Sequence, residues 1–273
     1  MVRVAAVQMD VLLGQPAPNR RAILALADST DADLVVFPEC SNSGYGFPDA
    51  PSALRSAESV PGPTTEALLA VARARNRTFV IGLLETADGA LWNAAAVVTP
   101  DGRFGKYRKV HLPFLGVDRF ATHGDAFPVF DTPAGRVGVQ ICYDLRFPEA
   151  SRALALGGAD ILAVPTNWPH GAEAMPRHLV AARAVENRVY VVTANRVGSE
   201  AGARFIGRSA VVDLRGEALA ALEDAQGVLV AEIDPPLARD KRTVNKPGEY
   251  EIDLFADRRP AAYERLTRSR VDA

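Results

Sequence analysis

Cysteine is scarce in this sequence, with Cys40 and Cys142 the two examples among 273 residues. Two cysteines do not make a disulfide framework of the kind that holds small secreted domains together. Lys and Arg (31) nearly balance Asp and Glu (33), and the net charge of -2 argues against a general nucleic-acid binder. We therefore expect free thiols, a reducing cytoplasmic location and no nucleic-acid partner.

Long apolar runs are missing as well. No stretch approaches the roughly 20 apolar residues that a membrane span needs. The start of the chain, MVRVAAVQMD, enters a strand-like run without the pattern of a signal peptide. The histidines His111, His123, His170 and His178 show neither HxH nor HExxH spacing. We expect no membrane partner and no metal ligand set.

Short runs rich in Val, Ile, Leu and Ala alternate with helical segments, which is typical of an α/β protein. The predicted strands are Val2–Met9, Leu34–Phe37, Phe79–Leu84, Ala94–Val98, Val137–Ile141, Ile161–Val164, Val189–Ala194, Ser209–Asp213 and Val228–Ile233. The predicted helices are Asn19–Ala27, Thr64–Asn76, Glu149–Leu156 and Ala172–Asn187. Glycine-containing turns in TPDGR and DLRGE indicate hairpins, so the sheets should be mixed.

The chain also repeats itself. Four segments of the first half resemble four of the second half in the same order: 3–6 and 136–139, 31–39 and 158–166, 76–80 and 187–191, 96–102 and 210–216. The ordered set indicates two similar α/β halves, each with helices on one face of its sheet. Packing the two sheets together gives a four-layer α-β-β-α sandwich, which we expect to form a single domain over residues 1–273.

The end of the chain, from about Ala238, differs in composition. It is rich in Arg, Asp and Glu but keeps apolar side chains, of which a disordered tail would have fewer. These are Tyr250, Ile252, Leu254, Phe255, Tyr263 and Leu266. An extended tail of this kind either packs on its own subunit or crosses to a second one, as in a homodimer or a higher homo-oligomer.

Three polar residues stand at or near the ends of strand-like runs: Glu39 after LVVFP, Lys109 within KYRKVHL, and Cys142 after GVQI. Each has a commoner structural explanation when taken alone, as a cap, a solvated charge or a packed thiol. Together they can perform acyl transfer. A carboxylate can take the proton of a thiol and return it to a leaving amine, while an ammonium stabilises the oxyanion.

The motifs around these residues resemble those of the carbon–nitrogen hydrolase family, also called the nitrilase superfamily, in its amidase or carbamoylase-like branch. LVVFPECSNSGY resembles the family's Glu motif, YRKVHLP its Lys motif and ICYDLRFPEASR its Cys motif. The resemblance implies Glu39 as the base, Lys109 as the lysine and Cys142 as the nucleophile, with the backbone N–H of Tyr143 in the oxyanion hole. It further implies the sandwich fold, a dimer and no metal or organic cofactor.

One family feature is missing from this chain. Many members carry a second glutamate shortly after the lysine motif, where this sequence reads HLPFLGVDRFATHGD and has no Glu. We predict that Asp118 takes its place, although its side chain is one methylene shorter. Asp125 is the second candidate.

The substrate is less well defined. Tyr-Asp follows Cys142, whereas nitrile-hydrolysing relatives more often have Trp-Glu, so the resemblance favours a small linear amide that is cleaved through a thioester with release of ammonia. The alternatives are an N-carbamoyl amino acid, a nitrile, or a catalytically idle binding subunit. Candidate substrate-binding residues are Tyr45, Phe114, Arg146, Asn167 and Trp168. Arg146 either holds a substrate carboxylate or pairs with Asp144 or Glu149.

Overall fold

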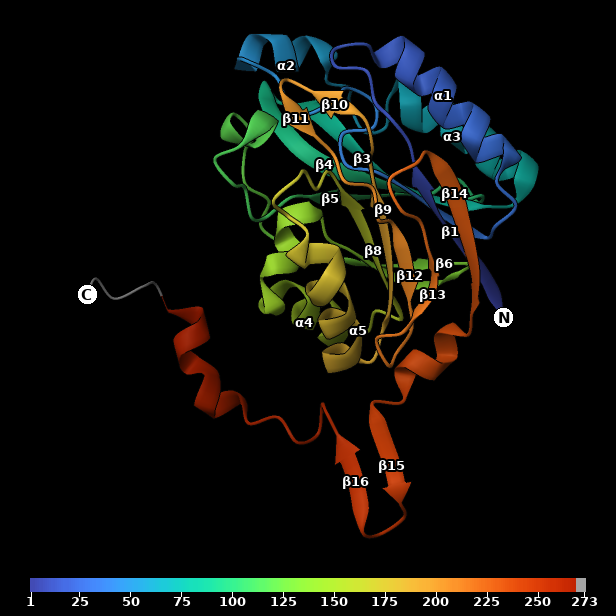
Figure 1. Cartoon of the computed structure of the whole chain (residues 1–273), viewed down its shortest axis with the longest axis vertical. Helices are drawn as coiled ribbons and strands as arrows, with labels where there is room; N and C mark the ends of the chain where they lie inside the picture. Colours follow the sequence, from blue (N-terminus) through green and yellow to red (C-terminus); the bar gives the residue numbers. More distant parts are fainter. Residues whose placement is uncertain (269–273) are drawn as a thin grey trace. The chain divides into compact units, whose positions relative to one another are not determined.

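Two six-stranded sheets form the centre of residues 1–239 (Figure 1). The computed structural model describes residues 1–268. The first sheet has the order β14-β1-β2-β3-β4-β5, with β1 (Val2–Gln8), β2 (Leu34–Phe37), β3 (Thr78–Ala87), β4 (Ala90–Val98), β5 (Phe104–Arg108) and β14 (Gly227–Ile233). The second has the order β13-β12-β9-β8-β7-β6, with β6 (Val129–Thr132), β7 (Gly135–Val139), β8 (Ile161–Thr166), β9 (Tyr190–Asn195), β12 (Ala210–Val212) and β13 (Ala218–Ala221).

The two sheets have the same pattern of strand directions. In the first, β1, β2 and β3 run parallel, and β4, β5 and β14 pair antiparallel with their neighbours. In the second, β7, β8 and β9 run parallel, and β12, β13 and β6 pair antiparallel. The four repeated sequence segments fall on the equivalent strand pairs β1 and β7, β2 and β8, β3 and β9, β4 and β12. The predicted internal repeat and the mixed sheets are confirmed.

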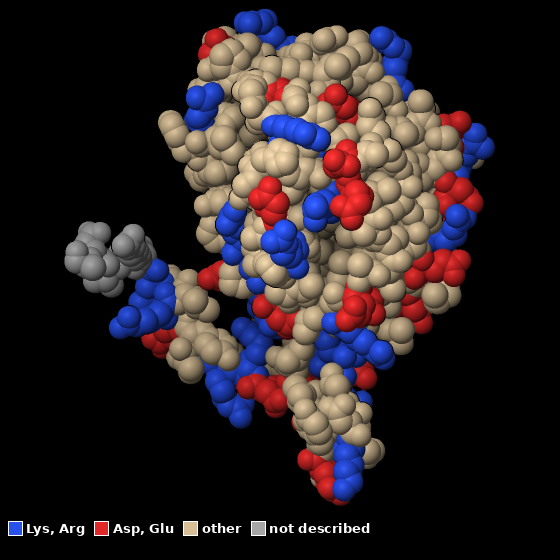
Figure 2. All heavy atoms as spheres, in the orientation of Figure 1, with Lys and Arg blue, Asp and Glu red and all other residues tan. Residues whose placement is uncertain are grey.

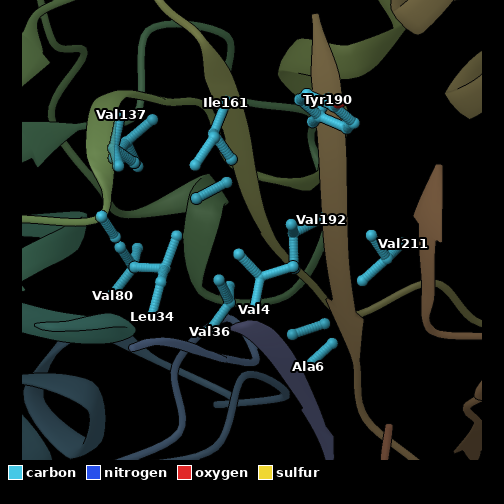
Figure 3. Packing of buried hydrophobic residues seen from close by; sticks show 14 of the residues in the cluster. Val4, Ala6, Leu34, Val36, Val80, Val137, Ile161, Tyr190, Val192 and Val211 are labelled. Atoms are coloured by element: carbon cyan, nitrogen blue, oxygen red, sulfur yellow. The ribbon is translucent and has the colours of Figure 1, made fainter. Parts of the chain in front are cut away.

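Alternate residues of the central strands face opposite layers. Val4, Leu34 and Val80 of the first sheet pack with residues of the second sheet such as Val137 and Ile161 (Figure 3). Their sequence neighbours point the other way, toward the helices. Because both faces of each central strand are covered, these strands read as continuous apolar runs.

Helices cover the outer face of each sheet (Figure 1). On the first sheet, α1 (Pro16–Ser29) and α3 (Pro63–Arg75) place Ile23 and Leu68 against Val35 and Phe79. Both helices begin with proline, whose fixed φ suits the first turn. On the second sheet lie α4 (Pro148–Leu156) and α5 (Val180–Asn187). The fold is therefore the predicted α-β-β-α sandwich.

Some elements differ from the sequence prediction. The segment Ala172–Asn187, predicted as one helix, contains a π-helical turn, η3 (Met175–Leu179), that runs into α5. The short helix α2 (Ala50–Ser56) and the hairpin of β10 (Ser199–Glu200) and β11 (Ala203–Arg204) were not predicted, because two to seven residues give too little periodicity to detect.

A second unit begins at Asp240. The predicted start at about Ala238 lies two residues earlier, in a 3₁₀ turn (Pro235–Arg239) where Ala238 is fully buried. The second unit contains a hairpin of β15 (Arg242–Lys246) and β16 (Tyr250–Asp253) and a 3₁₀ helix, η5 (Pro260–Thr267). Its exposed apolar side chains include Val244, Tyr250, Ile252, Tyr263 and Leu266. Its place in a dimer interface stays a prediction.

The surface carries charges of both signs. On the face shown in Figure 2, Lys and Arg side chains are interspersed with Asp and Glu. Within residues 1–268, no helix combines the length and the apolar character needed to cross a membrane.

Candidate active site

The three residues singled out by the sequence lie beyond strand ends. Glu39 follows β2 by two residues, Lys109 directly follows β5, and Cys142 begins a 3₁₀ helix, η2 (Cys142–Arg146), that follows β7. The first two come from the first sheet and the third from the second sheet. A Cβ at Gly82 would lie 2.5 Å from the Cα of Glu39, so glycine lets the Glu39 segment cross β3 closely. The site therefore spans the join between the halves.

A buried ionic cluster surrounds Lys109. Its Nζ donates hydrogen bonds to Glu39 Oε1 at 2.7 Å and to Asp118 Oδ2 at 2.6 Å. Asn93 Nδ2 donates to Glu39 Oε1 and to Asp118 Oδ1, each at 2.7 Å. All four side chains are at most 3% exposed. One ammonium between two carboxylates gives the ionised cluster a charge of about −1, which burial makes costly unless the partners are held in place.

Burial and charge act in opposite directions on the two principal groups. Burial raises the pKa of Glu39 more than the facing Lys109 ammonium lowers it, so the net shift is upward. Burial alone would lower the pKa of Lys109, but Asp118 and Glu39 overcome this and hold it well above its ordinary value. Lys109 is therefore an ammonium at neutral pH, and Glu39 is a stronger base than a solvated carboxylate.

Cys142 adjoins this cluster as a protonated, half-buried thiol. Burial raises the pKa of Cys142 to about 12, with a further contribution from the charge of Glu39. Within the described residues, Glu39 Oε2 is buried and has no hydrogen-bond partner, so it is available to accept a proton. The backbone of Cys142 has a φ of 46°, a left-handed conformation that is uncommon outside glycine and occurs at functional sites.

Asp144 ties the Cys142 turn to the Lys109 segment. Its carboxylate accepts hydrogen bonds from the backbone N–H of Ile141 at 2.8 Å and of His111 at 3.0 Å. It also accepts one from the hydroxyl of Tyr107 at 2.6 Å and lies 2.8 Å from Nδ1 of His111. These contacts fix the thiol-bearing turn relative to the segment that carries the lysine.

Two carboxylates hold Tyr45. Its hydroxyl donates a hydrogen bond to Asp118 Oδ2 at 3.0 Å. Glu200 accepts the backbone N–H groups of Tyr45, at 2.8 Å, and of Gly46, and it pairs with the fully buried Arg196 at 2.8 Å. The backbone of Tyr45 is thus held from the second half of the chain, and its phenol hydroxyl from the first.

A cavity of about 290 Å³ opens onto the thiol. Its wall includes five of the predicted site residues besides Cys142: Tyr45, Tyr143, Arg146, Asn167 and Trp168. The remaining candidate, Phe114, lines an adjoining cavity instead. The structure therefore gathers the predicted residues around one region, with Phe114 beside it.

Arg146 is exposed at the wall of the thiol cavity. The pairing with Asp144 that the sequence allowed does not occur, because Asp144 is occupied by Tyr107, His111 and Ile141. No carboxylate of residues 1–268, Glu149 included, forms an ion pair with the Arg146 guanidinium, which leaves that group available to a ligand.

Sequence reasoning missed three residues of this site: Asn93, Asp144 as an anchor, and Glu200. The signal for Asn93 was a polar residue inside the apolar run LWNAAAVV. Asp144 was considered only as a partner of Arg146. Glu200 had no local signal, since the site residues that it holds, Tyr45 and Gly46, lie 155 and 154 residues away in the chain. In the part of the chain that the structure describes, no group of three or more His, Cys, Asp or Glu side chains is arranged to hold a metal ion.

Asp118, and not Asp125, contacts Lys109. Replacing Asp118 with alanine removes one of the two carboxylates that hold the ammonium, and a displaced group costs about 10²-fold in rate for a shift of about 1 Å. We expect kcat/KM for amide hydrolysis to fall by about that factor. The matched control is Asp125→Ala, an exposed residue, which should change kcat/KM little. Unchanged activity in Asp118→Ala would remove Asp118 from the site.

Comparison with known families gives a single result. The carbon–nitrogen hydrolase family model matches residues 3–243. A protein from Pyrococcus abyssi named nitrilase is 42% identical over 97% of this chain and 100% of its own. The human protein named omega-amidase NIT2 is 32% identical over 93% of this chain and 96% of its own.

Solved structures agree with the sequence relatives. A carbon–nitrogen hydrolase from Helicobacter pylori G27 superposes with a TM-score of 0.87 at 26% identity, covering 99% of each chain. An amidase from Nesterenkonia sp. AN1 superposes with a TM-score of 0.80 at 25% identity, covering 97% of this chain and 96% of its own. That structure is of a glutamate-to-glutamine mutant of the amidase, in which the acetamide moiety of fluoroacetamide is covalently added at the active-site cysteine.

Proposed function

Since the chain belongs to the carbon–nitrogen hydrolase family and acts as an amide-directed hydrolase of that family, we propose that it cleaves small linear amides through a Cys142 thioester and releases ammonia. The observation that carries the proposal is the half-buried thiol at the cavity wall, beside a buried carboxylate with one free oxygen and a buried ammonium. The covalent adduct on the cysteine of the Nesterenkonia amidase supports the same nucleophile.

In the first step Glu39 takes the thiol proton while Sγ of Cys142 attacks the amide carbon. The C–S bond forms, and the carbonyl oxygen becomes an oxyanion. The Lys109 ammonium and the backbone N–H of Tyr143 stabilise this oxyanion. Concerted proton removal is needed because the thiol, with a pKa of about 12, provides almost no thiolate at neutral pH.

In the second step the protonated Glu39 gives its proton to the leaving nitrogen, the C–N bond breaks, and ammonia departs. A thioester remains on Cys142. Water then enters, Glu39 takes one of its protons, and the oxygen attacks the thioester carbon. The C–S bond breaks, Glu39 returns the proton to Sγ of Cys142, and the carboxylic acid leaves. Asp118, Asn93 and Tyr45 keep the ammonium in place throughout.

The dependence of kcat/KM on pH should show a fall on the acidic side and none on the mildly alkaline side. Glu39 must be ionised to act as a base, and its pKa is raised above the ordinary value of 4.5, so kcat/KM should fall as the pH drops through that raised pKa. Toward high pH no fall is expected from Cys142, whose pKa is about 12, or from Lys109, whose pKa is raised. Steady-state rates over the range of stable pH test this, and a descending limb near the pKa of an ordinary thiol would contradict it.

An acidic substrate fits the exposed guanidinium of Arg146 in the thiol cavity. We propose amides that carry one remote carboxylate, such as the ω-amides of dicarboxylic acids; the human relative is named an omega-amidase. An N-carbamoyl amino acid also offers a carboxylate, while a nitrile is suggested by the name of the Pyrococcus relative.

Arg146→Met separates acidic from neutral substrates. A charge-assisted hydrogen bond contributes about 1.5–3 kcal/mol, so the KM for succinamate should rise by about 10-fold or more. Butanamide, with the same number of carbons and no charge, is the matched control, and its KM should change little. An equal change for both amides, or loss of the fold, would assign Arg146 a structural role.

An ammonia-release screen over short aliphatic amides, ω-amides, N-carbamoyl amino acids and nitriles tests the function itself. Release of ammonia from at least one amide is expected. If the folded protein releases none from the whole panel, the chain is an idle binding subunit of the same fold.

A further inference from the structure

A second cavity of about 310 Å³ adjoins the thiol cavity, and its size is within the range of ligand pockets. The two cavities share the wall residues Tyr45, Leu115, Asn167 and Pro169, whereas Cys142 lines the first alone. A molecule attached to or held near the thiol can therefore extend past Asn167 into the second cavity.

The two charged residues of the second cavity both form hydrogen bonds within the chain, but only Glu200 has a partner of opposite charge. Glu200 accepts two backbone N–H groups and the guanidinium of Arg196. Arg119 donates to the backbone carbonyls of Gly116 and Phe47, each at 3.0 Å. The Glu200 charge is compensated by Arg196, so a cation entering this cavity would lose its hydration without a partner. Arg119 is exposed and forms no ion pair with a carboxylate of residues 1–268, so its charge is not compensated by the chain.

The rest of the wall of the second cavity is mostly apolar, and part of it is exposed to solvent. Phe114 is 90% exposed and Leu115 is 53% exposed, while Phe205 and Ala203 complete the surface. Large apolar side chains that are exposed beside a cavity often mark a ligand-binding surface. An apolar group of a ligand would remove this surface from water.

Asn167 lies in the wall shared by the two cavities. It is 4% exposed, and neither its Nδ2 nor its Oδ1 has a partner within the described residues. Buried amides are nearly always hydrogen-bonded, so this one is expected to bind a polar group of the ligand, such as its carbonyl.

The acyl side of the substrate is the part that can reach this cavity. The leaving nitrogen must take its proton from Glu39, which is 1% exposed and lines neither cavity. The leaving group therefore faces the buried cluster, and the acyl chain faces the opening.

We propose that the second cavity is an apolar subsite for an alkyl or aryl extension of the acyl group, with Asn167 hydrogen-bonded to the substrate between the two cavities. This inference rests on the proposed cleavage of linear amides and adds a second substrate class beside the ω-amides: amides with an uncharged acyl chain long enough to pass Asn167. The carboxylate partner Arg146 lines the thiol cavity and not this one.

The test measures binding without turnover, by calorimetric titration of the Cys142→Ala full chain with the linear amides from acetamide to hexanamide. Burying one methylene corresponds to about fourfold in affinity. We expect Kd to fall by about that factor for each methylene beyond the first two. A Kd that does not change with chain length overturns the subsite.

A substitution that fills the second cavity tests whether the acyl chain binds there. Ala203→Phe, added to Cys142→Ala, should reduce the hexanamide-to-acetamide affinity ratio at least tenfold, and Ala203→Leu should reduce it less. The matched control is Ala218→Phe on β13, outside both cavities, which should keep the ratio. An unchanged ratio in Ala203→Phe overturns the location. Chain-length-independent binding with normal ammonia release would reject the subsite alone, whereas tighter binding of longer amides without any hydrolysis by the wild type would reject the proposed function alone.

Discussion

Alanine in place of Cys142 is expected to abolish ammonia release while the fold is kept. The thiol is the only group at the cavity that the proposed reaction makes covalent, and loss of a nucleophile removes at least about 10³-fold of the rate. Its side chain is half-buried and small, so the free energy of unfolding should change by no more than about 1 kcal/mol. Initial rates and a thermal melt measure the two effects.

Cys40 provides the matched control for this experiment. It also has a left-handed backbone, with a φ of 49°, but it is fully buried and lines neither of the cavities described above. Burial raises its pKa well above the ordinary value. Cys40→Ala should lose stability through the small void and keep most of its activity. Equal loss of activity in both variants would mean that the effect at Cys142 is structural.

Methionine in place of Lys109 is expected to lower both stability and activity. It leaves two buried carboxylates, Glu39 and Asp118, without their ammonium. Removing one partner of a buried ion pair costs about 3–5 kcal/mol in the free energy of unfolding. The loss of a charged oxyanion donor should lower kcat by at least about 10²–10³-fold. Chemical denaturation and initial rates measure the two losses.

The stability loss should also depend on pH with a known sign. Without Lys109, burial and the charge of Asp118 hold the pKa of Glu39 above that of the unfolded chain with no ammonium to lower it. Stability is then retained at low pH and lost as the pH rises through the folded value. The variant should therefore recover part of its stability as the pH falls toward about 4, the usual pKa of carboxyl groups in the unfolded chain.

Lys106 is the control for the loss of a lysine charge outside the buried cluster. It lies on β5 and pairs with Glu85, but its side chain is 35% exposed, and Glu85 keeps a second partner in Arg108. Lys106→Met should cost less stability than Lys109→Met, because Arg108 still pairs with the buried Glu85 carboxylate. A loss from Lys109→Met no greater than that from Lys106→Met would contradict the buried cluster.

Much of the fold could be predicted because the sequence repeats it. The resemblance of residues 3–6 to 136–139, and of three further segments, predicted two equivalent halves, and the strand directions of both sheets follow that pattern. The residues of the Glu, Lys and Cys motifs could be placed at strand ends by the same reasoning. Short elements such as α2 and the hairpin β10–β11 could not, since their stability comes from tertiary contacts and not from local periodicity.

Contacts of the site between residues far apart in the chain could not be predicted from the sequence. Asn93 contacts Glu39 across 54 positions, and Glu200 contacts Tyr45 across 155. Nothing local marks either pair. Phe114 was placed near the thiol by its motif, but whether it lines the thiol cavity or the adjoining one depends on the loop conformation between Leu112 and Asp125.

Mass spectrometry of the acyl-enzyme tests the proposed chemistry most directly. The wild-type protein is mixed with a short amide, quenched in acid during turnover, digested and analysed peptide by peptide. We expect the peptide that contains Cys142 to gain the mass of the acyl group, while the Cys40 peptide stays unmodified. Continued ammonia release with no acyl group on Cys142, or with the acyl group on Cys40, would contradict the assignment of Cys142 as the nucleophile.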